Sequence, residues 1–113
     1  MMQTLAIILQ IILGLGFLLF GVTKFISKKM VEGFDHFGLP QWLRVVTGVL
    51  EILGAIGLIV GIWSPAIATL ASVGLAIIMF FATLTHLRAR DPFSTLLMPS
   101  MLFILLIIVV FLQ

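Results

Sequence analysis

The sequence predicts an all-α protein, a bundle of four membrane-spanning helices with a short interfacial segment between the first and the second. Apolar residues make up 63% of the 113 residues, charged residues only 9%, and the mean hydropathy is +1.40. The apolar residues form four runs, each close to the roughly 20 residues that cross a hydrocarbon core. A chain of this length has room for one domain, residues 1–113, and no separate soluble domain.

The first run extends from Thr4 to about Phe25 and is expected to stay in the protein as a helix, because no basic n-region precedes it and it is longer than a signal h-region. In the break that follows, Met30, Phe34 and Phe37 have the i, i+4, i+7 spacing of one helical face. This spacing predicts a short amphipathic helix in the membrane interface. A loop whose aromatic side chains dip into the headgroups explains it equally well.

The later runs are separated by turn-forming residues. Pro65 suits the first turn of a helix, and Asp91 before Pro92 is typical of a turn or helix cap. Trp42 and Trp63 lie at the two ends of one run, as interfacial anchors do. The three predicted helices are Trp42–Ile62, Pro65 to about Leu87, and Thr95–Leu112.

The basic residues predict the orientation in the membrane. All six lie in or beside the first and third breaks, and the second break carries no charge. By the positive-inside rule, those two breaks face the cytoplasm and both termini face outward, with a bacterial plasma membrane as the expected location. The net charge of +2 is too small and too confined to loops to indicate nucleic acid as a partner.

Glu51 is the leading candidate for a functional residue because it interrupts an almost wholly apolar run. A charge in the middle of a spanning helix costs roughly 3 kcal/mol, so this carboxylate must be paired, protonated, or face a wet or ligand-filled cavity. Gly54, Gly57 and Gly61 form a small-residue stripe that predicts close helix packing nearby. Glu51 should therefore point into the bundle.

The expected neighbours of Glu51 are polar residues of the same membrane half. The first and third spanning helices run parallel, so Lys24 and His86 at their ends come from the same cytoplasmic half as Glu51. We predict that Lys24 forms an ion pair with Glu51. Thr47 lies beside Glu51 on its helix, and Arg44 is far for direct pairing but within reach if both side chains extend. His86 either joins the site or faces the headgroups. The group either forms a ligand or proton site or only fixes helix register.

No metal site is predicted. His36 and His86 are the only histidines, and no carboxylate stands at ligand spacing from them. The chain has no cysteine, and it carries no flavin or nicotinamide motif, so redox chemistry would need a bound cofactor or a partner.

Three segments resemble the DoxX-like family of small four-helix membrane proteins. They are GVTKF at the end of the first predicted helix, FGLPQWL at the entry to the second, and EILGAIGLIVGIW through it. The order of the shorter motifs along the chain also resembles the family: Gly21 and Lys24 come first, then Gly38 to Pro40, then Thr85 with His86. The resemblance implies a four-helix membrane fold. Family members are linked to quinone-coupled thiosulfate oxidation, membrane redox complexes, quinone or catechol stress, and receptor assembly in animals, and most have no assigned reaction.

Two functions remain in view. In the first, the protein is an accessory subunit of a membrane redox or quinone-linked system. It holds a quinone or lipid near Glu51, with Lys24 or His86 donating to the ligand oxygen, and a membrane redox partner supplies electrons. In the second, it is a non-catalytic scaffold or assembly factor whose glycine stripe docks another membrane helix. The sequence decides neither enzymatic activity nor homo-oligomerisation, and a transporter is disfavoured by the single buried acid.

Overall fold

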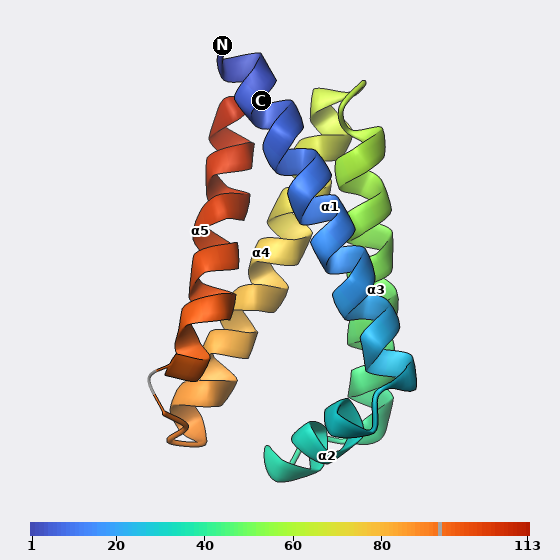
Figure 1. Ribbon diagram of the computed structural model, residues 1–113, viewed down its shortest axis with the longest axis vertical. Helices are drawn as coiled ribbons and strands as arrows, with labels where there is room; N and C mark the ends of the chain where they lie inside the picture. The colour runs from blue at the N-terminus through green and yellow to red at the C-terminus, as the bar shows by residue number, and fades with distance from the viewer. Residues whose placement is uncertain (93) are drawn as a thin grey trace.

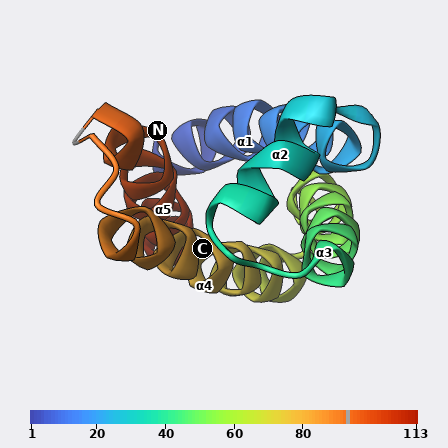
Figure 2. The same cartoon turned by 90° about the horizontal axis from the view of Figure 1, so that it is seen from below.

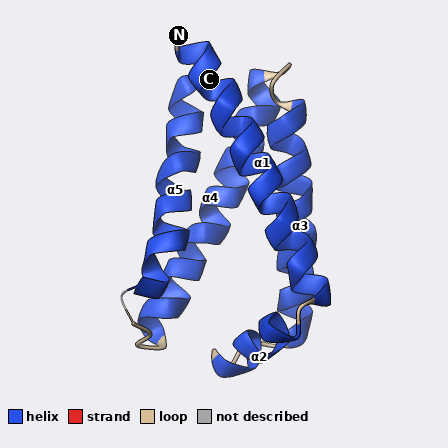
Figure 3. Cartoon of the chain, in the orientation of Figure 1, coloured by secondary structure: helices blue, strands red, loops and turns tan. Residues whose placement is uncertain are grey.

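The computed structural model describes residues 1–92 and 94–113, which form five α-helices and no strand (Figure 3). Four of the helices are long and apolar enough to span a membrane, and the fifth is a short helix between the first two of these. The all-α prediction is confirmed. The helices are α1 (Met2–Ile26), α2 (Lys28–His36), α3 (Gln41–Val60), α4 (Pro65–Arg88) and α5 (Ser94–Leu112).

The long helices alternate in direction along the chain. α1 descends in Figure 1, α3 returns, α4 descends and α5 returns, so both termini lie at the same end. α1 packs mainly on α3, and α4 packs on α5 and on α3. This order places all six basic residues at the end opposite the termini. Which side of the membrane that end faces stays a prediction.

Local hydrogen bonds explain two helix boundaries. Ser64 accepts a bond from the Ile67 N–H at 3.5 Å and caps α4, and Pro65 occupies the first turn as expected. α3 ends two residues earlier than predicted. The N–H groups of Ile62 and Trp63 bond to carbonyls only three residues back, so a tight turn replaces the last part of the predicted helix.

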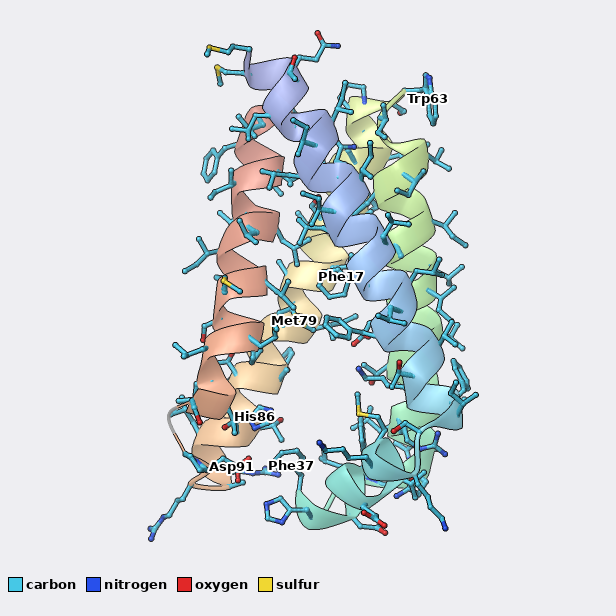
Figure 4. The ribbon with its side chains drawn as sticks, viewed as in Figure 1. Phe17, Phe37, Trp63, Met79, His86 and Asp91 are labelled. Atoms are coloured by element: carbon cyan, nitrogen blue, oxygen red, sulfur yellow. The ribbon has the colours of Figure 1, made fainter. Side chains whose placement is uncertain are left out.

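The core lies between the four long helices and consists of large apolar side chains. Phe17, Leu58 and Leu106 are fully buried there. Many other apolar side chains point outward, which suits a surface covered by lipid hydrocarbon. Trp63 is exposed at the end of the bundle that carries the termini (Figure 4), as an interfacial anchor would be.

Glycines set the closest helix contacts. The carbonyl oxygens of Gly21 and Gly48 lie 3.1 and 2.9 Å from the places where a Cβ on the other glycine would sit, so α1 and α3 meet almost backbone to backbone. No pattern in the sequence predicted this contact.

The predicted glycine stripe of α3 faces α4 of the same chain. A Cβ added at Gly54, Gly57 or Gly61 would lie 2.6 to 2.8 Å from Leu75, Ala71 or Ala68 respectively. The stripe is therefore a packing surface, as predicted. The idea that it docks the helix of another protein is wrong, because α4 already covers it.

Candidate functional site

Glu51 and Lys24 form a buried ion pair. The Lys24 Nζ lies 2.9 Å from Glu51 Oε1 and 3.1 Å from Oε2. The Glu51 side chain is 1% exposed and that of Lys24 is 12% exposed. Glu51 lies about 15 Å along α3 from its first residue at 1.5 Å per residue, well inside the spanning segment. The predicted contact between Lys24 and Glu51 is present. It could be predicted because a charge inside a spanning helix needs a partner, and Lys24 comes from the same half of the membrane.

Arg44 stabilises the position of Lys24 and does not reach Glu51. α1 ends where the Ser27 N–H bonds to the Thr23 carbonyl, and the Arg44 guanidinium donates to the next carbonyl, that of Lys24. The Nε of Arg44 also donates to Gln41 Oε1 at 2.8 Å. Arg44 thus caps the end of α1 from α3, and the pairing with Glu51 that two extended side chains would have allowed is not formed.

A cavity of about 790 Å³ borders the ion pair. It lies between α2, α3 and α4, and most of its lining is apolar. Its volume is within the range of small-molecule sites, which combine an apolar wall with a few polar groups. The polar or charged lining residues are Lys24, Thr47, Glu51, Thr85, His86 and Arg88.

The cavity opens toward the lipid. The lining residues Val46 and Leu50 of α3 and Ile77 and Phe81 of α4 are 41 to 61% exposed. They lie within membrane-spanning helices, so the exposed part of this opening faces hydrocarbon. A ligand dissolved in the bilayer could therefore reach the ion pair without crossing water.

The break between the first two spanning helices is the helix α2, so the amphipathic-helix interpretation is correct and the loop interpretation is wrong. Met30, Phe34 and Phe37, the residues of its predicted apolar face, all line the cavity. α2 has no fully buried residue. Its apolar face therefore closes the end of the cavity away from the termini.

His86 belongs to a cluster that the sequence analysis missed. Its Nδ1 lies 2.8 Å from Asp91 Oδ2, and the His36 Nε2 lies 3.4 Å from Oδ1 of the same carboxylate. The Phe37 ring packs edge-on against the His86 ring at 4.9 Å, and Figure 4 shows Phe37, His86 and Asp91 together at the lower end of the bundle. From the sequence, Asp91 is predicted only to form a turn or a helix cap. Because His36 and His86 are far apart in sequence, only the fold reveals that one carboxylate serves both.

The charge of this cluster follows from its hydrogen bonds. The bond from His86, and after it the bond from His36, holds the pKa of the Asp91 carboxyl below its usual value of 3.8. An ionised carboxylate can only accept, so each facing imidazole nitrogen carries a hydrogen. The Nε2 of His86 then remains to interact with a ligand in the cavity.

Gln10 is a further buried polar residue that the sequence analysis did not consider. Its side-chain amide donates to the Leu58 carbonyl at 2.9 Å and accepts from Gln113 at 3.3 Å. The Leu58 carbonyl lies in the last turn of α3, so Gln10 acts as a cap between helices. A single amide in an apolar run is the signal that could have identified it.

Among residues 1–92 and 94–113, no group of three side chains is arranged to bind a metal.

The sequence profile of the DoxX-like family matches residues 8–109. An uncharacterized protein of Bacillus subtilis strain 168, YdgD, is 34% identical over 90 residues, which cover 77% of this chain and 78% of the relative. No solved structure matches the chain significantly.

Proposed function

Because the chain belongs to the DoxX-like family and is an integral membrane protein, we propose that its cavity binds a lipophilic ligand beside Glu51 and that it serves as an accessory subunit of a membrane redox or quinone-linked system. The cavity is the observation that carries the proposal. It joins an apolar wall, open to the bilayer, to a buried charged pair. A quinone has matching parts, an apolar ring and tail with polar oxygens at one end.

The polar groups have distinct roles in this proposal. Lys24 has three donor hydrogens, so it can hold Glu51 and still donate to a ligand oxygen. Glu51 accepts from a ligand hydroxyl or, when protonated, gives its proton to a ligand oxygen that the partner's electrons reduce. His86, held at Nδ1 by Asp91, offers Nε2 to the same ligand. Thr47 lines the cavity, but its hydroxyl donates to the Leu43 carbonyl at 2.7 Å, so it can only accept from a ligand.

The proposed location is a bacterial plasma membrane with both termini outside. The six basic residues at one end of the bundle and the relative from Bacillus subtilis support it. Electrons would come from a membrane partner, because the chain itself carries no nicotinamide or flavin motif.

Native mass spectrometry tests the ligand site. The protein is released gently from its membrane, and its bound lipids and quinones are identified for wild type, Glu51→Gln and Glu32→Gln. Glu32 is the matched control, because it is exposed on α2 and lies outside the cavity lining. The proposal expects a molecule that wild type and Glu32→Gln retain and Glu51→Gln loses. The same lipids on all three proteins would contradict it.

A scaffold role is the second candidate function. The buried pair and the cap from Arg44 would then serve only to fix the register of α1 and α3. Any docking surface for a partner would have to be elsewhere than the glycine stripe. Co-purification of a membrane protein by wild type and Glu51→Gln alike, with neither retaining a ligand, would favour this role.

A further inference from the structure

α2 spans one end of the cavity without being built into the core. Seen from below in Figure 2, it crosses part of the space between α1, α3 and α4. None of its residues is fully buried, although Met30 and Phe34 face the cavity. Segments with few buried contacts open at low free-energy cost. This helix is therefore the part of the cavity wall that can move most easily.

Both ends of α2 have a backbone suited to a hinge. Ser27 separates α1 from α2 with an extended conformation, at φ −88° and ψ 122°. At the other end Gly38 has φ +71°, a region that other residues rarely adopt, and extended Pro40 follows before α3. Hinges are commonly a few such residues at element ends. α2 can thus rotate as a unit without unwinding α1 or α3.

One cluster ties the end of α2 to the end of α4 across the cavity. His36 and His86 both hydrogen-bond to Asp91, and Phe37 stacks edge-on against both imidazoles, with ring centroids 5.2 and 4.9 Å away. His86 and Phe37 also line the cavity. The cluster therefore lies where α2 would separate from α4 if the cavity opened to water. We name His36, Asp91 and His86 the clasp.

We propose that α2 is a hinged lid over the polar end of the cavity and that the clasp holds it closed. The lid separates Lys24 and Glu51 from the aqueous phase while the opening between α3 and α4 admits molecules from the bilayer. An access route of this kind selects ligands by their solubility in lipid. The proposal concerns the same cavity as the proposed function, but its test needs no ligand, so the two can fail separately.

The absence of cysteine makes the test direct, since one introduced thiol is the only one in the protein. Thr47→Cys places that thiol in the cavity wall, and its reaction rate with a charged, water-soluble maleimide is measured in nanodiscs. Glu32→Cys, on the exposed face of α2, reports the rate of an open site. Asp91→Asn is then added to each to weaken the clasp. Asp35→Asn is the matched control, because Asp35 bonds to Gln41 and not to the histidines.

Asp91→Asn should raise the reaction rate of the cavity thiol in Thr47→Cys about tenfold, the factor expected from losing one hydrogen bond to a charged group. Asp35→Asn should leave that rate unchanged, and the thiol of Glu32→Cys should react equally fast in all backgrounds. His36→Gln is a second opening variant on a side chain that is 64% exposed, so misfolding is not at issue. If neither Asp91→Asn nor His36→Gln raises the reaction rate of the cavity thiol above that of Thr47→Cys alone, the proposal is overturned. An equal increase with Asp35→Asn would overturn it too.

Discussion

Replacing Lys24 by Met tests the energetics of the buried pair. Two unit charges 2.9 Å apart attract by about 6 kcal/mol at an effective dielectric of 20. Each charge costs roughly 3 kcal/mol within the membrane, so the attraction and the two costs nearly cancel. Loss of one partner leaves the other charge buried alone. We expect Lys24→Met to lower the free energy of unfolding by about 3 to 5 kcal/mol.

The double variant separates pairing from packing. Replacing Lys24 and Glu51 together by Met keeps the volume and removes both charges, so its stability should lie within about 1 kcal/mol of wild type. Lys29→Met, which removes an exposed lysine, should change stability by no more than about 0.5 kcal/mol. Unfolding by sodium dodecyl sulfate, followed by far-ultraviolet circular dichroism, gives all four values. A cost below about 1 kcal/mol for Lys24→Met, or equal costs for the single and double variants, would refute the reasoning.

Three other predictions follow from single contacts. Gly61→Ala should destabilise the protein by about 1 to 3 kcal/mol because its new methyl group meets the backbone of α4. Gly74→Ala is the control and should not destabilise it, because there is open space at that position. Thermal unfolding in detergent compares the two variants. Arg44→Met should cost about 1 to 3 kcal/mol in the same assay, since the end of α1 loses its cap, and an unchanged melting temperature would argue against that role. Hydrogen bonds lower the pKa of Asp91 in the folded protein, so the stability that they provide is present above pH 3.8, the usual pKa, and is lost as the pH falls through the lower pKa of the folded protein. Nuclear magnetic resonance can follow the His86–Asp91 contact during such a titration. Loss of that contact already at about pH 5 would contradict this prediction.

The sequence predicted the four spanning helices because long apolar runs have few other solutions in a chain of this size. It also predicted the partner of Glu51, because an isolated charge in a membrane helix requires one and helix directions left few choices. The short helix α2 could only be given as one of two alternatives, since nine residues hold too little periodicity to decide.

Contacts that depend on tertiary geometry were beyond the sequence. The clasp joins His36 to Asp91 across 55 positions, and the close approach of Gly21 to Gly48 links two different helices. Neither leaves a local pattern. Arg44 shows a different limit, because its position on α3 permitted two partners and the free carbonyl at the end of α1 proved to be the nearer one.

Photoaffinity labelling in native membranes would test most directly whether the cavity is a ligand site. A photoreactive quinone analogue is bound, activated by light, and its attachment sites are mapped by peptide mass spectrometry. Met30 and Met79 line the cavity, whereas Met98 and Met101 are half-exposed on α5 and lie outside the cavity lining. We predict labelling near Met30 and Met79 that an excess of unlabelled quinone suppresses. Labelling spread equally over Met98 and Met101, with no effect of the competitor, would contradict a binding site beside Glu51.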